Sequence, residues 1–251
     1  MALRKRIGLV LPSTNSTCEP DYYNVSPAGV SIHTARMMLV DGSAQGGEDG
    51  YDRMNDSIED CARALATTHV DVAVYGCTSG SFIKGPEYDA QVGKLIAGHT
   101  HTPVICTSPA VIAGIRSFGA KRVSVATPYA DWVNDRLANY LELCGFEVAN
   151  VDGNYDETPD GDQQICDQDP EAVMEFAARV FDASADAMLL SCTSWRALEI
   201  AEQLEKRIGK PVITSNQATI WAALKALGLT DPIEGYGQLL RNIGAAPDAV
   251  Q

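Results

Sequence analysis

Two copies of the tripeptide Cys-Thr-Ser are the strongest chemical signal in the sequence, and they begin at Cys77 and Cys192. The thiolate is the reactive form of cysteine, and backbone N–H groups in a turn stabilise it. The hydroxyls of Thr78, Ser79 and Thr193 add hydrogen-bond donors that suit a carboxylate. The pair therefore predicts acid–base or nucleophilic thiol chemistry on a small carboxylate substrate.

The elements that must position these thiols follow an alternating pattern. Short apolar runs rich in strand-forming residues alternate with segments of helical periodicity, which is typical of an α/β fold with parallel sheets. The apolar runs are residues 7–11, 70–75, 104–106, 123–126, 187–190 and 212–214, and helical spacing is clearest at 54–65, 133–144, 173–181 and 198–208. Asp169 followed by Pro170 predicts a helix start, and Gly145 and Gly209 predict helix ends.

The chain also repeats itself. Segment 6–12 resembles 122–128, segment 71–79 resembles 186–194, and segment 103–105 resembles 211–213, at offsets of 116, 115 and 108 residues. Three matched segments in the same order predict two pseudo-symmetric α/β lobes, residues 1–117 and 118–251. Each lobe is expected to be a parallel sheet flanked by helices. Whether the last helix packs on the first lobe is left open.

The repeat places both cysteines just after a strand. Ligands of open parallel sheets bind beyond the carboxyl ends of the strands, so the two thiols are expected to face one cleft between the lobes. The loop after the first run contributes Ser13 and Asn15, and its counterpart contributes Tyr129. We expect these side chains to donate hydrogen bonds to a bound carboxylate. The other five cysteines are interpreted as packing residues, although Cys106, at a strand end, could line the cleft. A disulfide between Cys77 and Cys192 is a redox alternative.

Other patterns are less specific. His99 and His101 would share one face of a strand, but no third ligand completes a metal site. No glycine-rich nucleotide motif is present, so we expect neither a metal nor an organic cofactor. Residues 152–171 hold eight acidic side chains and no basic one, which fits either a solvated loop or a lid over the cleft.

The overall composition excludes several classes of function. The chain has 251 residues, with 19 Lys and Arg against 33 Asp and Glu, so its formal net charge is −14. Nucleic acids and anionic membranes both attract basic surfaces, so neither is an expected partner. No apolar stretch approaches the roughly 20 residues of a membrane helix. Seven cysteines, an odd number, indicate thiols in a reducing cytoplasm. A homodimer is compatible with this sequence, which leaves the oligomeric state open.

The sequence resembles the aspartate/glutamate racemase superfamily, in its maleate isomerase and arylmalonate decarboxylase branch. The segments that carry the resemblance span almost the whole chain; they are residues 12–15, 76–85, 126–129, 133–137, 190–192 and 235–237. The resemblance implies two pseudo-symmetric lobes and cofactor-independent cysteine chemistry on small carboxylates. It matches Cys77 and Cys192 to the two family cysteines, and Asn15 and Tyr129 to substrate-binding residues.

Three features depart from the patterns of the branch. Arylmalonate decarboxylases have glycine at the position of Cys77, whereas maleate isomerases follow their first cysteine with apolar residues rather than Thr78 and Ser79. A second asparagine of the maleate isomerases has no counterpart in residues 159–163. The thiol pair therefore resembles that of the isomerases, and the hydroxyl pair resembles the carboxylate cradle of the decarboxylases.

The leading hypothesis is a two-cysteine isomerase most like a maleate cis-trans isomerase. A racemase of an amino acid or 2-substituted acid and a decarboxylase of a substituted malonate are the enzymatic alternatives. A non-catalytic carboxylate-binding or thiol-redox module is the remaining one. The sequence does not give the substrate or the stereochemical course.

Overall fold

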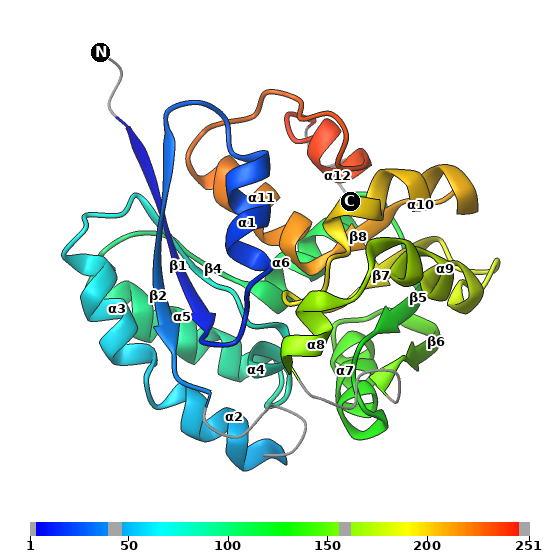
Figure 1. Cartoon of the computed structure of the whole chain (residues 1–251), viewed down its shortest axis with the longest axis horizontal. Helices are drawn as coiled ribbons and strands as arrows, with labels where there is room; N and C mark the ends of the chain where they lie inside the picture. The colour runs from blue at the N-terminus through cyan, green and yellow to red at the C-terminus, as the bar shows by residue number, and fades with distance from the viewer. Residues whose placement is uncertain (1–3, 40–46, 156–161, 246–251) are drawn as a thin grey trace.

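Two parallel β-sheets of four strands each form the centre of the molecule (Figure 1). The computed structural model describes residues 4–39, 47–155 and 162–245. The first sheet has the order β2-β1-β3-β4 and the second β6-β5-β7-β8. The strands are β1 (Lys5–Pro12), β2 (Val30–Met37), β3 (Val72–Tyr75), β4 (Val104–Cys106), β5 (Arg122–Thr127), β6 (Glu147–Gly153), β7 (Ala187–Leu190) and β8 (Val212–Thr214). The predicted fold class is confirmed.

Helices cover the faces of both sheets, as the alternating pattern predicts. Those of the first half are α1 (Cys18–Val25), α2 (Gly47–Asn55), α3 (Ile58–Ala66), α4 (Thr78–Phe82), α5 (Pro86–Thr100) and α6 (Thr107–Arg116). Those of the second are α7 (Asp131–Leu143), α8 (Asp162–Asp167), α9 (Pro170–Val180), the 3-10 helix η2 (Leu198–Ile200), α10 (Ala201–Ile208), α11 (Ser215–Ala226) and α12 (Gln238–Arg241). None of the described helices is long and apolar enough to cross a membrane.

The repeat in the sequence corresponds to equivalent strands of the two sheets. β1 and β5 are the second strands in their sheets, and β3 and β7 are the third. An aspartate precedes each of β3 and β7, and in both halves its carboxylate accepts backbone N–H groups at the start of the neighbouring strand. The carboxylate of Asp71 accepts the N–H of Arg6 (2.7 Å), and that of Asp186 accepts those of Lys121 and Arg122 (2.9 Å each). Each aspartate thus ties the start of one strand to the start of its neighbour.

The predicted helix boundaries are confirmed where they depend on local chemistry. Asp169 accepts the N–H of Glu171 (2.8 Å) at the start of α9, and its proline occupies the first turn. Gly145 and Gly209 have φ of 88° and 69°, a left-handed conformation in which a Cβ atom would be strained.

Two local expectations are corrected. The apolar pattern over 54–65 belongs to two helices, α2 and α3, because α2 ends at Asn55 and α3 begins at Ile58. His99 lies in the last turn of α5 and His101 follows it with φ 55°, so the two do not share a strand face. His99 lies 3.3 Å from Glu59. In the described ranges, no group of three or more His, Cys, Asp or Glu side chains is placed to hold a metal ion.

Helix α11 connects the two halves of the molecule. It follows β8 of the second sheet, and its side chains pack against α1, α6, β3 and β4 of the first half. The buried cluster around β1 and β3 accordingly contains Ile220, Ala223 and Leu224 of α11. The division of the chain between residues 117 and 118 stays a prediction, as do the homodimer, the cytoplasmic location and the absence of nucleic-acid and membrane partners.

Candidate active site

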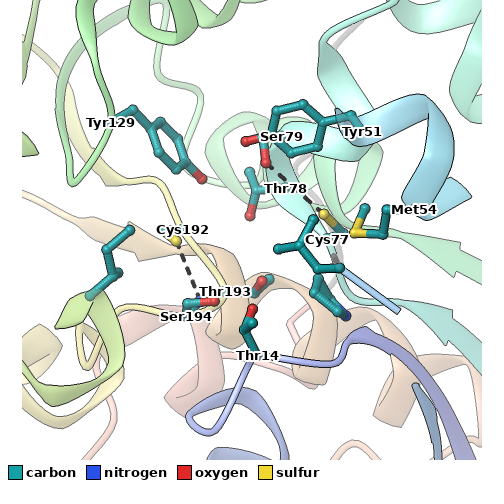
Figure 2. A pocket seen from close by; sticks show the side chains of 13 residues that line it. Thr14, Tyr51, Met54, Cys77, Thr78, Ser79, Tyr129, Cys192, Thr193 and Ser194 are labelled. Carbon is teal, nitrogen blue, oxygen red and sulfur yellow. Dashed lines mark hydrogen bonds between the residues drawn. The ribbon is translucent and has the colours of Figure 1, made fainter. Parts of the chain in front are cut away.

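Cys77 and Cys192 lie on opposite sides of one pocket between the two sheets (Figure 2). Each stands two residues beyond the end of a central strand, β3 or β7. Cys77 has an extended backbone (φ −137°, ψ 110°) and caps the N-terminus of α4, whereas Cys192 begins a turn that leads toward η2. The two cysteines therefore occupy equivalent positions in the two halves, but a helix follows one of them and a turn follows the other. All seven cysteines lie in the described residues and are thiols rather than disulfides.

The pocket is narrow and opens to solvent, and residues of both halves of the chain line it. Its empty volume is about 390 Å³, counted to the open solvent at its mouth. The lining residues are Pro12, Thr14, Leu39, Tyr51, Met54, Cys77, Thr78, Ser79, Tyr129, Ile165, Cys192, Thr193 and Ser194. None of these described residues carries a formal charge when the thiols are protonated. An anionic ligand would therefore be held by neutral donors, as expected for a chain of net charge −14.

Three hydroxyl groups gather along one side of the pocket (Figure 2). They belong to Thr78 and Ser79, in the first turn of α4, and to Tyr129, which follows β5. Thr78 Oγ1 donates to Ser215 Oγ (3.1 Å), and Ser79 Oγ lies 4.0 Å from Cys77 Sγ. The first N–H groups of a helix have no acceptor within the helix and favour negative charge, so this side of the pocket suits a carboxylate.

The hydroxyl of Tyr129 is the most available donor in the pocket. Its oxygen is buried, the thiol of Cys192 is the group that faces it, and no other described residue accepts a hydrogen bond from it. Burial, and after it the negative charge that Cys192 carries as a thiolate, raise the pKa of Tyr129 well above the ordinary value for a phenol. The hydroxyl therefore keeps its proton at neutral pH. Sulfur is a weak acceptor, so a carboxylate bound in the pocket would be a stronger partner for this hydroxyl.

The turn at Cys192 is tied to the opposite half of the molecule. The N–H of Ser194 donates to Cys192 Sγ (3.3 Å). Thr193 Oγ1 donates to the carbonyl of Gly76 (3.2 Å), the residue before Cys77, and accepts from Asn15 Nδ2 (3.1 Å). Thr193 thus joins the two cysteine loops, in addition to lining the pocket.

Asn15 and Ser13 lie beside the pocket rather than along its described wall. Asn15 is fully buried, and its Oδ1 accepts the N–H groups of Thr17 (3.1 Å) and Cys18 (2.9 Å). Ser13 Oγ accepts the N–H of Leu39 (3.0 Å), a pocket residue. Both side chains therefore support the lining in this structure, and their direct contact with a substrate stays a prediction.

Apolar side chains complete the pocket, and none of them is among the site residues that the sequence predicts. Tyr51 and Met54 lie one turn apart on α2 and are almost fully buried, at 3% and 1% exposed. Pro12, Leu39 and Ile165 are the other apolar residues of the described lining. The spacing of Tyr51 and Met54 on one helix face is the only signal that the sequence offers, and it equally fits ordinary core packing.

The acidic segment 152–171 is not a single loop. Residues up to Gly153 belong to β6, α8 spans Asp162–Asp167, and α9 begins at Pro170. Ile165 of α8 lines the pocket, so part of the segment contributes to the site. Asp156, Glu157 and Asp160 lie outside the described residues, and the solvated loop and the lid stay alternative predictions for this segment.

The other five cysteines lie outside the pocket lining. Cys18, Cys61, Cys106 and Cys166 are buried, and Cys144 is half-buried at the end of α7. Cys106 ends β4 at a position like that of Cys77, but its thiol donates to the carbonyl of Asp89 (3.6 Å). Burial raises the pKa of Cys106 to about 12, so it remains a thiol at neutral pH.

Comparison with known proteins shows the family of the chain. The family model described as arylmalonate decarboxylase matches residues 7–240, which is most of the chain. The chain belongs to the arylmalonate decarboxylase family. It is 29% identical to the arylmalonate decarboxylase of Bordetella bronchiseptica, with 93% of this chain and 95% of that protein aligned.

Maleate isomerases resemble this member of the arylmalonate decarboxylase family equally well. The chain is 31% identical to the maleate isomerase of Nocardia farcinica, with 96% of this chain and 97% of that protein aligned. A solved structure of a cysteine-to-serine variant of the N. farcinica maleate cis-trans isomerase superposes with a TM-score of 0.85 at 28% identity. It covers 94% of this chain and 98% of its own, and contains a covalently bound succinylcysteine intermediate.

Replacing Tyr129 by phenylalanine is expected to lower kcat/KM by roughly 10–150-fold. The change removes one buried hydrogen bond to a charged group, worth about 1.5–3 kcal/mol, and leaves the ring in place. Steady-state kinetics with maleate check it, and Tyr23→Phe, at an exposed tyrosine of α1, is the matched control. Near-wild-type kinetics for Tyr129→Phe would mean that this hydroxyl does not hold the substrate.

Proposed function

We propose that this protein is a cofactor-independent isomerase that converts maleate, or a close analogue, to its trans isomer by means of two cysteines. One observation carries the proposal: Cys77 and Cys192 lie across a single small pocket, with hydroxyl donors between them. The succinylcysteine in the related N. farcinica enzyme supports covalent cysteine chemistry.

The proposed reaction starts with addition of the Cys77 thiolate to one alkene carbon of maleate. A C–S bond forms, and the π electrons move to the neighbouring carbon, where the adjacent carboxylate delocalises them. Cys192 gives its proton to that carbon, which leaves a thioether with a carbon–carbon single bond. Rotation about this bond brings the two carboxylates apart. The Cys192 thiolate then removes the proton, the double bond forms again, and the C–S bond breaks to release Cys77 as a thiolate.

The donors around the pocket would stabilise the charge that develops in this reaction. Addition of sulfur spreads negative charge onto one carboxylate, which becomes enolate-like. The hydroxyls of Thr78, Ser79 and Tyr129 are placed to donate to it, and such preorganised donors act most strongly where water is excluded. The N–H of Ser194 would stabilise the Cys192 thiolate after it has given up its proton.

A decarboxylase of a substituted malonate is the second candidate, because the family model that matches carries that description. In that reaction one carboxylate leaves as CO₂ and Cys192 protonates the resulting enolate, while Cys77 has no role. A racemase would use the same two thiols as acid and base on opposite faces of one carbon. Neither alternative reaction forms a covalent bond between a cysteine and the substrate.

Proton NMR in D₂O with a panel of substrates distinguishes these activities. We expect maleate to convert to fumarate without release of CO₂. Aryl- and alkylmalonates and single enantiomers of amino acids serve as the comparison substrates. Release of CO₂ from a malonate at a rate above that of maleate conversion would replace the isomerase assignment by the decarboxylase. Exchange of the α-proton of an amino acid for deuterium would replace the isomerase assignment by a racemase.

A further inference from the structure

A single peptide group connects the thiol of Cys192 to a buried amide behind the pocket. The carbonyl of Thr193 accepts from Asn216 Nδ2 (2.9 Å), and the N–H of the same peptide, on Ser194, donates to Cys192 Sγ (3.3 Å). The C=O and N–H of a trans peptide point in opposite directions. Asn216 on one side therefore sets the direction of the N–H that reaches the thiol on the other.

The orientation of the Asn216 amide is itself fixed by a second acceptor. Its Nδ2 also donates to Asp21 Oδ2 (2.7 Å). A carbonyl and a carboxylate are both acceptors, so the NH₂ end of the amide must face them. Asp21 belongs to α1, and Asn216 is the second residue of α11. The start of α11 is held by a capping box between Thr214 and Gln217, so Asn216 projects from a rigid element.

The link is buried and contains a carboxyl group, and burial of such a group without a cation is unfavourable for folding. Asp21 is 3% exposed and Asn216 2% exposed. No ion pair in the described part of the chain involves Asp21. The pKa of Asp21 is raised to about 7, mainly by burial; the hydrogen bond from Asn216 lowers it, and the charges of Glu199 and Arg196 have smaller effects in opposite directions. Buried carboxyl groups without a cationic partner destabilise a fold, and perturbed ones cluster near functional sites.

We propose that Asn216, held in place by Asp21, is a positioning residue for Cys192. It orients the Thr193–Ser194 peptide so that the N–H of Ser194 stabilises the Cys192 thiolate. Cys77 is the N-cap of α4, and its loop is joined to Thr193 through the Thr193 side chain and the carbonyl of Gly76 rather than through the Thr193–Ser194 peptide. We therefore expect the two thiols to be tuned separately. The effect on turnover rests on the proposed proton-transfer role of Cys192, but the effect on the thiol does not.

The thiol itself gives the first test. Iodoacetamide reacts with thiolates, so its rate at each cysteine as a function of pH, followed by peptide mapping, reports how readily each thiol ionises. In Asn216→Ala we expect the midpoint for Cys192 to move upward by about one pH unit or more, since a misdirected N–H no longer stabilises the thiolate. The midpoint for Cys77 should stay where it is. An unchanged Cys192 midpoint in folded Asn216→Ala, or an equal shift at both cysteines, would overturn the proposal.

Variants of Asp21 provide a second and independent test. Asp21→Ala should produce part of the same shift, and Asp21→Asn, which retains an acceptor oxygen, should restore most of the wild-type midpoint. Because Asp21 acts through Asn216, adding Asp21→Ala to Asn216→Ala should cause no further shift. Additive shifts in the double variant would refute the ordered link. If Asn216→Ala fails to fold, the two single Asp21 variants decide the question, and a Cys192 midpoint that stays unchanged in Asp21→Ala would overturn the proposal.

A matched control removes another buried carboxylate. Asp89 is also 3% exposed, and it accepts from Tyr140 (2.9 Å) and from Ser81 of α4. Asp89→Asn should leave the Cys192 midpoint unchanged, so a shift there would attribute the effect to general loss of stability and overturn the proposal. In Asn216→Ala, kcat should fall at least about tenfold with little change in KM. If the Cys192 midpoint shifts as expected while kcat is unchanged, the positioning role holds and the proposed proton-transfer role of Cys192 fails.

Discussion

Cys77→Ala is expected to lower the rate of maleate isomerisation by about a thousandfold or more, because removal of a covalent nucleophile typically costs several orders of magnitude. The side chain reaches the pocket from the N-cap of α4, and the lining includes only one other thiol, Cys192. Steady-state kinetics measure the loss, and circular dichroism shows whether the variant folds.

Cys144→Ala is the matched control for this loss. Cys144 is half-buried at the end of α7 and does not line the described pocket. Its replacement should leave kcat/KM near the wild-type value. A Cys77→Ala variant that retained more than about a tenth of wild-type turnover would exclude the nucleophile role.

Cys192→Ser is expected to reduce turnover by a similar factor while leaving the addition step possible. A serine hydroxyl or water can supply a proton to the carbanion, but serine is too weak a base to remove that proton again. The cycle should therefore stop at the thioether. Rapid-quench kinetics would show a slow, stoichiometric loss of maleate with little fumarate. Steady production of fumarate at the wild-type rate would assign the proton transfer to another group.

The sequence predicts six of the eight strands in the described part of the chain. The six predicted apolar runs correspond to β1, β3, β4, β5, β7 and β8. The two strands that it misses, β2 and β6, are the edge strands at equivalent positions of the two sheets. β6 contains no buried residue and β2 only two, so neither strand has a continuous apolar run to detect, whereas the edge strand β8 is buried throughout and is predicted. Helix α8 is short and rich in Asp and Gln, and the sequence does not predict it.

The site shows a similar division between local and long-range information. Cys77 and Cys192 follow their strands directly, so a strand prediction and a repeat are enough to place them in one cleft. The partners of Asn15 and Asn216 depend on contacts across many residues: Asn15 binds Thr193, and Asn216 binds Asp21. No local pattern encodes such pairings. The sequence therefore identifies the thiols and leaves the network that orients them to the structure.

The most direct test of the central claim is to locate the covalent intermediate. Cys192→Ser protein is incubated with maleate, and its intact mass and tryptic peptides are then measured. The two-cysteine mechanism predicts a mass increase of one maleate per chain, carried by the peptide that contains Cys77, and no such increase for the Cys77→Ala/Cys192→Ser double variant. An unmodified Cys77 under conditions in which the wild-type enzyme forms fumarate, or an adduct on another cysteine, would contradict the mechanism.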